Sequence, residues 1–182
     1  MYERIFLFMK NIVLIGMPAA GKSTIGVILA KVLGLRFMDS DLLIQEQERC
    51  LLKDIISRDG IDGFLKIENQ VNRDIKARNS VIATGGSIVY GKEAMEHLRE
   101  IGIVVYLRLS YETINTRLGN IKQRGVVLRE GQNLRSLYEE RCPLYERYAH
   151  IIIDSEGLGT EELMEKIALA VVNYNVKHGT DF

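Results

Sequence analysis

The chain has 182 residues, 47% of them hydrophobic, which is enough to bury a substantial core within one domain. Its 24 Lys and Arg balance its 24 Asp and Glu, and a formal net charge of zero gives no field to attract nucleic acid or an anionic membrane. No stretch approaches the ~20 apolar residues of a membrane span. We therefore expect no nucleic-acid partner and no membrane partner.

The two cysteines, Cys50 and Cys142, form neither a disulfide framework nor a zinc site by themselves, which favours free thiols and a cytoplasmic location. Near the N-terminus the apolar run IFLFM is shorter than the ~7 residues of a signal-peptide core. A second methionine follows at Met9. The hypothesis that Met9 is the natural start makes residues 1–8 a non-native or disordered extension.

A glycine-rich loop follows the first predicted strand, NIVLI at Asn11–Ile15, and precedes a helix predicted over Thr24–Leu33. The loop reads GMPAAGKST and has the spacing G-x-x-x-x-G-K-[ST]. Backbone N–H groups of such a loop, together with the helix N-terminus, bind an anion. Lys22 would bind the β- and γ-phosphates and Ser23 would bind Mg²⁺. The loop predicts binding of a nucleoside triphosphate.

Short apolar runs then alternate with longer helical patterns. Four more strands are predicted at Leu35–Asp39, Ser80–Thr84, Ile103–Leu109 and His150–Asp154. The intervening helices are predicted at Asp41–Arg49, Leu51–Arg58, Phe64–Ala77, Lys92–Glu100, Tyr111–Leu118, Leu134–Tyr148 and Glu161–Asn173. This alternation predicts a single α/β domain with a parallel sheet that is covered on both faces. Ligands of such sheets lie beyond the carboxyl ends of the strands.

Two of these strand ends carry polar or glycine-rich motifs. FMDSD ends with Asp39 and Asp41, of which one carboxylate could hold Mg²⁺ and the other could accept the proton of an attacking hydroxyl. The alternative is that Asp41 only caps the following helix. TGGS, residues 84–87, offers free backbone N–H groups to a ligand or simply forms a tight turn.

The segment from Gly119 to Arg135 is polar, contains glycines and is rich in cations, among them Lys122, Arg124 and Arg129. It is long enough to form a lid, in which an arginine could stabilise charge on a transferred phosphoryl group. Without the phosphate loop, a solvated loop would be the simpler interpretation.

GMPAAGKST, FMDSD, TGGS, the cationic segment and R-x-P-L-Y-x-x-x-A, in this order, resemble the shikimate kinase family. The resemblance covers nearly the whole chain. It implies a three-layer P-loop kinase fold, with a five-stranded parallel sheet flanked by helices and a mobile lid. It also implies a monomer and transfer of the γ-phosphate of ATP, with Mg²⁺, to the 3-hydroxyl of shikimate.

The resemblance also implies roles for individual residues. Asp41, Lys22 and Arg124 would be catalytic, with Asp41 as the base. Ser23 would bind Mg²⁺ directly and Asp39 through water. The acceptor would lie against Asp41, Gly85, Gly86 and Arg141. The nucleotide would be bound by Pro18, Ala19, Ala20, Gly21, Lys22, Ser23, Thr24, Arg117 and Arg124.

The sequence departs from the family pattern G-E-x-x-F-R-x-x-E, because Gly60–Glu68 reads GIDGFLKIE. Leu65 stands where the family has an arginine that clamps the shikimate carboxylate. Ser87 and Gly125 replace a family glycine and a family proline. Losing an arginine–carboxylate pair costs about 2–4 kcal/mol, which corresponds to roughly a 30- to 1000-fold higher KM. Either another cation substitutes, with Lys66, Arg73 and a lid residue as candidates, or the acceptor differs. Leu65 could instead belong to an apolar stripe.

Three functions follow from this reading. The first is a shikimate kinase with a modified acceptor site, and the second is a kinase of the same fold for another small hydroxy acid or polyol. The third is a nucleotide-binding regulator without transferase activity. The complete catalytic set argues against the third, since a regulator would not need it.

Overall fold

A computed structural model describes residues 10–119, 126 and 128–178. At its centre lies a parallel sheet of five strands in the order β2-β3-β1-β4-β5. The strands are β1 (Asn11–Ile15), β2 (Arg36–Asp39), β3 (Ser80–Ala83), β4 (Gly102–Arg108) and β5 (Ile151–Asp154). The predicted α/β class and the five predicted strands are confirmed, with strand ends that differ by one residue at most.

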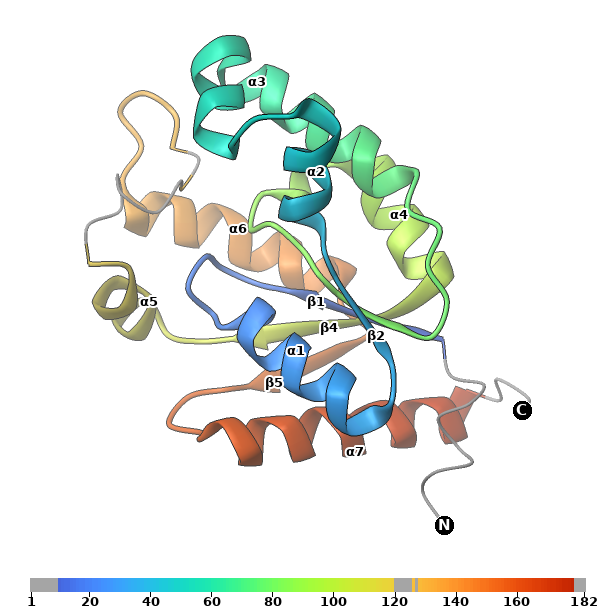
Figure 1. Cartoon of the computed structure of the whole chain (residues 1–182). Coiled ribbons are helices and arrows are strands. Elements are labelled where there is room, and N and C mark those ends of the chain that lie inside the picture. The colour runs from blue at the N-terminus through green and yellow to red at the C-terminus, as the bar shows by residue number, and fades with distance from the viewer. Residues whose placement is uncertain (1–9, 120–125, 127, 179–182) are drawn as a thin grey trace.

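Helices cover both faces of this sheet (Figure 1). α1 (Lys22–Leu33) and α7 (Thr160–His178) lie along one face, while α4 (Lys92–Ile101) and α6 (Leu134–Tyr148) lie along the other. Every residue of β1 is buried, as are all residues of β4 but the last. Their continuous apolar sequences therefore reflect strands that are covered on both sides.

The break predicted between helices at Leu51–Arg58 and Phe64–Ala77 is present, because the backbone at Gly60 is not helical, with φ of 69° and ψ of 179°. After α2 (Ser40–Glu48), α3 (Leu52–Arg73) therefore consists of two helical segments that join at this kink, and the second ends at Arg73, earlier than predicted. Glycine adopts this backbone conformation without the steric penalty of a Cβ atom, so the helix changes direction there. The remaining elements are α5 (Tyr111–Leu118) and the short 3-10 helix η2 (Ile88–Tyr90).

The residues at the carboxyl ends of the strands lie at one edge of the sheet because of the strand register. Asp39 at the end of β2 pairs with Ala83 at the end of β3, and Ala83 also pairs with Leu14 of β1. The chain segments that follow these three strands therefore begin side by side. They contain the phosphate loop, the aspartate pair and the TGGS turn.

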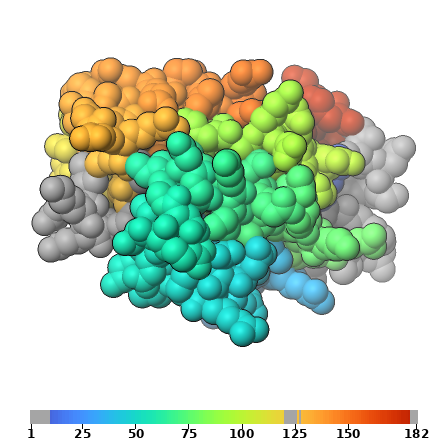
Figure 2. All heavy atoms as spheres, turned by 90° about the horizontal axis from the view of Figure 1, so that it is seen from above, coloured from blue at the N-terminus to red at the C-terminus, as the bar shows by residue number. Residues whose placement is uncertain are grey.

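A second apolar cluster supports α2 and α3 apart from the main core, and it consists of Ile44, Ile55, Phe64 and Val71. Seen from above, the teal-to-green surface of α3 borders the orange surface of residues 128–148, which includes α6 (Figure 2). No helix in the described ranges is long and apolar enough to cross a membrane.

Candidate active site

The phosphate loop joins β1 to α1 through backbone conformations that few residues adopt. Gly16, Ala19 and Gly21 have φ values of 146°, 63° and 90°. A Cβ atom at Gly16 would lie 2.8 Å from the carbonyl oxygen of Leu107, so only glycine fits there. α1 begins at Lys22, two residues earlier than predicted, and its N-terminal N–H groups therefore face the loop.

Lys22 lies within this loop and is only 8% exposed. Its ammonium donates hydrogen bonds to the carbonyl oxygens of Gly16 at 2.8 Å and Met17 at 2.9 Å. Burial lowers the pKa of Lys22 to about 8, and the negative charge of Asp41 opposes this shift. The side chain is therefore mostly protonated at neutral pH and presents a positive charge to an anion.

Ser23 and Asp39 form an oxygen pair beside the loop. The Ser23 hydroxyl donates to Oδ2 of Asp39 at 2.7 Å, while Oδ1 of Asp39 accepts from the backbone N–H of Asp41 at 3.0 Å. Asp39 is thus the N-cap of α2, and the alternative that Asp41 caps this helix was wrong. In the described part of the chain no group of three or more His, Cys, Asp or Glu side chains could hold a metal ion. Mg²⁺ fits this pair all the same, because it retains water and phosphate oxygens as ligands.

Asp41 occupies the second position of α2 and lines two adjoining cavities. The larger cavity, about 320 Å³, is lined by Pro18, Ala19, Gly21, Lys22, Ser23, Thr24, Asp41, Leu52, Thr84, Gly85 and Gly86. Burial raises the pKa of Asp41 to about 6, to which the charge of Asp39 adds and which Lys22 opposes. The carboxylate is therefore ionised at neutral pH, yet it is basic enough to accept a proton.

Most residues that were predicted to bind nucleotide line this larger cavity. Ala20 does not, because its side chain is buried and its N–H donates to the Met17 carbonyl at 3.1 Å. Arg117 lies on the exposed side of α5, 3.4 Å from the carbonyl oxygen of Ala19, which places it at the rim of the loop. Arg124 and Gly125 lie outside the described residues.

Gly85 and Gly86 follow β3 and approach their neighbours closely. A Cβ atom at Gly85 would collide with Oε1 of Glu68 and would lie 2.7 Å from Oδ1 of Asp41, while one at Gly86 would lie 2.8 Å from the ring of Pro18. These contacts, rather than a left-handed turn, explain why glycine stands at both positions.

The smaller cavity continues from Asp41 toward α3 and α6. It is about 40 Å³ and is lined by Pro18, Asp41, Leu52, Phe64, Glu68, Gly85, Gly86, Ser87, Val126 and Arg141. Arg141, on α6, is 1% exposed, and its Nε donates to the Tyr90 hydroxyl at 3.2 Å. The structure thus brings together the four residues predicted to bind the acceptor, from three separate segments: α2, the loop after β3 and α6.

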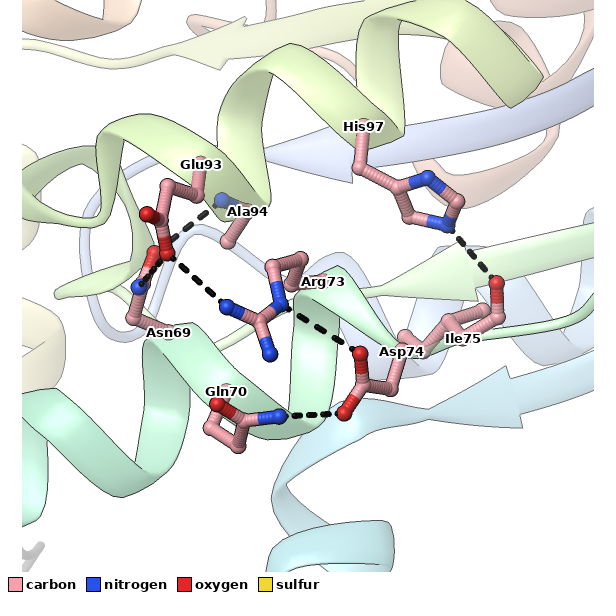
Figure 3. A network of polar contacts seen from close by, with 8 residues as sticks. All are labelled: Asn69, Gln70, Arg73, Asp74, Ile75, Glu93, Ala94 and His97. Atoms are coloured by element: carbon pink, nitrogen blue, oxygen red, sulfur yellow. Dashed lines mark hydrogen bonds and ion pairs between the residues drawn. The ribbon is translucent and has the colours of Figure 1, made fainter.

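Two candidates for a cation to replace the arginine missing at Leu65 lie away from this cavity. Arg73 contacts Asp74 at 3.3 Å and Glu93 at 3.2 Å, in a polar network that joins α3 to α4 (Figure 3). Lys66 is exposed and does not line the cavity. Leu65 itself packs against the second apolar cluster, as the apolar-stripe alternative predicted.

Sequence reasoning assigned no role to Glu68, which the structure places in the smaller cavity and buries to 1% exposure. Burial raises the pKa of Glu68 to about 8, and a hydrogen bond from Ser87 opposes this shift. One feature of the sequence could have indicated a role for Glu68. It matches the last residue of the family pattern, although the arginine that the pattern has three positions earlier is absent. Ser87, noted only as a departure from the family pattern, lines the same cavity.

The fold and the site together define a P-loop kinase of small molecules: a phosphate loop, a largely buried carboxylate beside it and a second cavity beyond that carboxylate. The family model for shikimate kinase matches residues 18–172. A shikimate kinase of Thermodesulfovibrio yellowstonii is 38% identical over 162 residues, which cover 87% of this chain and 93% of that protein. The chain belongs to the shikimate kinase family.

Solved structures agree with this assignment. A shikimate kinase from Acinetobacter baumannii in complex with shikimate superposes with a TM-score of 0.85 at 33% identity, covering 94% of this chain and 97% of that one. The shikimate kinase from Aquifex aeolicus gives 0.78 at 30% identity, covering 93% and 99%. The five-stranded P-loop kinase fold expected from the sequence is therefore confirmed.

Proposed function

We propose that this protein transfers the γ-phosphoryl group of ATP to the 3-hydroxyl of shikimate, giving ADP and shikimate 3-phosphate. One observation carries the proposal: Asp41 lines both cavities, so a single carboxylate faces the phosphate loop on one side and the site of Arg141 on the other. A group that removes a proton from the acceptor must lie at this junction.

In this mechanism the γ-phosphate lies at Lys22 and the N-terminus of α1. Asp41 accepts the proton of the attacking hydroxyl, the hydroxyl oxygen forms a bond to the γ-phosphorus, and the bond to the β-phosphate oxygen breaks. Lys22 neutralises negative charge on the transferred group. Ser23 and Asp39 would hold Mg²⁺, which supplies further neutralisation when bound.

Arg141 would orient the acceptor by pairing with its carboxylate. Its burial strengthens such a pair, because few water molecules compete for the guanidinium. Arg124 would act on the phosphates from the lid, as in the family pattern. We also propose a monomeric enzyme.

A second function is favoured by one specific observation. Among the described residues that line the smaller cavity, Arg141 is the one cation, and Leu65 stands where the family has another. A kinase for a different hydroxy acid or polyol would have less need of two arginines.

Steady-state ADP release with Mg·ATP and a titration of shikimate tests the proposal, with phosphorus NMR to identify the product. We expect saturable ADP release, with a KM for shikimate that the missing arginine raises, and formation of a phosphate monoester. A response absent up to tens of millimolar, with ATP binding intact, would show that the acceptor is another compound. Reactions that lack shikimate control for ATP hydrolysis.

A further inference from the structure

Two carboxyl groups, from different helices, line the smaller cavity. Asp41 comes from α2 and Glu68 from the second half of α3. Glu68 is almost completely buried, and its Oε1 has no hydrogen-bond partner within the described part of the chain. A buried polar atom of this kind costs free energy unless a ligand supplies the missing hydrogen bond.

The two carboxyl groups converge on one place. A Cβ atom built on Gly85 would contact both Oε1 of Glu68 and Oδ1 of Asp41. Both oxygen atoms therefore face the space above the Gly85 backbone, within the acceptor cavity. Arg141 lines the same cavity from α6, and Phe64 and Leu52 contribute apolar surface.

This arrangement fits a ligand with two adjacent hydroxyl groups. If the reacting hydroxyl lies at Asp41, the neighbouring hydroxyl of a vicinal diol lies within reach of Glu68. A hydroxyl both donates and accepts hydrogen bonds, so it can pair with the carboxyl group in either protonation state.

We propose that Glu68 is an acceptor-binding residue whose Oε1 hydrogen-bonds the hydroxyl next to the one that is phosphorylated, which makes the enzyme selective for vicinal diols. This inference rests on the proposed function, and for shikimate the hydroxyl in question is the one at position 4.

The charged groups around Glu68 come from three other elements: Asp41 on α2, Lys22 on α1 and Arg141 on α6. Ser87, just before η2, hydrogen-bonds the carboxyl group from the loop after β3. Because the pKa of Glu68 is raised to about 8, the group is mostly a neutral acid at pH 7. A neutral acid does not repel an anionic acceptor that binds at Arg141.

The experiment compares two acceptors, shikimate and 4-deoxyshikimate, on wild type, Glu68→Gln and Glu68→Ala. We expect Glu68→Ala to raise the KM for shikimate by about tenfold and the KM for 4-deoxyshikimate by less than about twofold. Glu68→Gln retains a hydrogen-bonding group and should give a smaller rise with shikimate. If the effects on KM of the Glu68 variant and of the missing 4-hydroxyl are not additive, the two groups are in direct contact.

Asn72→Ala is the matched control, because Asn72 is buried one turn further along α3 and donates to the backbone carbonyl of Glu68 at 2.8 Å without lining the cavity. It should change the KM values for both acceptors by equal factors. If Glu68→Ala also changes both equally, Glu68 only supports the packing of α3 and the inference is wrong. Should Glu68→Ala fail to fold by circular dichroism, the same comparison with Glu68→Gln decides.

Failure of the proposed function would look different. If wild type does not phosphorylate shikimate, the acceptor assignment is wrong, and a panel of hydroxy acids with and without vicinal hydroxyls replaces the pair. A lower KM for vicinal diols than for the matched acceptors without a neighbouring hydroxyl, and loss of this difference in Glu68→Ala, would support the role of Glu68. Equal KM values for the two kinds of acceptor on wild type would overturn it.

Discussion

The nucleotide side and the acceptor side of this site are built in different ways. The nucleotide side comes from one continuous segment, β1, the phosphate loop and the start of α1, whose contacts are mainly backbone groups and one lysine. The acceptor side brings Asp41, Glu68, Gly85 and Arg141 together from α2, α3, the loop after β3 and α6.

The difference extends to what supports each side. The phosphate loop follows a fully buried strand in the main core. The helices α2 and α3 pack on a smaller cluster of four buried residues. The comparison suggests why the phosphate loop fits a common pattern while the acceptor side departs from it: a phosphate is the same in every reaction, whereas each acceptor needs its own side chains.

Asp41→Asn should give the largest difference between the two sides, a large loss of kcat with nearly unchanged ATP affinity. Asparagine keeps the shape but cannot accept the proton of the hydroxyl, so kcat should fall about 10³-fold. ATP affinity, measured by titration calorimetry, should change by less than about twofold. Full activity in this variant would show that another group is the base.

Arg141→Lys tests the acceptor side alone. Lysine keeps the charge but loses the planar, bidentate geometry, so the KM for shikimate should rise by about 30-fold with the KM for ATP unchanged. Arg147→Lys is the control, because Arg147 is exposed on the same helix. An equal rise of both KM values would mean that α6 supports the whole site instead of the acceptor.

Leu65→Arg restores the family arginine and should strengthen binding on the acceptor side, whereas the two preceding variants weaken the site. Residue 65 precedes Glu68 by three positions on α3, so an arginine there can favour the ionised form of Glu68, pair with it and add a positive charge near the acceptor. We expect the KM for shikimate to fall by about tenfold. Leu65→Met, which keeps the packing, should leave it unchanged. A rise in KM for Leu65→Arg would argue that the natural acceptor does not place a carboxylate here.

The smallest expected effect is on stability. The pKa of Glu68 is raised from 4.5 to about 8, so the folded protein holds a proton that the unfolded chain releases. The free energy of unfolding should therefore fall as pH rises from about 4.5 to about 8, by at most about 1.4 kcal/mol per pH unit.

Urea titrations between pH 6 and 7.5 measure this effect as the difference between wild type and Glu68→Gln, because Asp41, with a pKa of about 6, and Lys22, with a pKa of about 8, titrate partly in the same window in both proteins. In Glu68→Gln, the free energy of unfolding should depend much less on pH. The variant should therefore become more stable relative to wild type as pH rises. Identical slopes for the two proteins would show that Glu68 titrates normally.

Much of the fold was predictable because strands buried on both faces have continuous apolar sequences, and glycines mark the ends of α1 and α5. The break in α3 was predictable, but the ends of its two segments were not, since a glycine such as Gly60 can end a helix or kink it. Which of these occurs depends on the packing of α3 against α2 and α4.

By itself, the sequence determined the phosphate loop and the aspartate pair, because each depends on neighbouring residues and local spacing. It also indicated the parallel sheet, through the alternation of apolar runs with helical patterns. Only the tertiary structure decided that Asp39, not Asp41, caps α2, that Arg73 belongs to the α3–α4 network, and that Glu68 meets Asp41 above Gly85. The last two arrangements join residues that are far apart in the chain, whereas the cap depends on the orientation that the Asp39 side chain adopts at the end of β2. Strand register and helix packing, which no short motif encodes, bring them together.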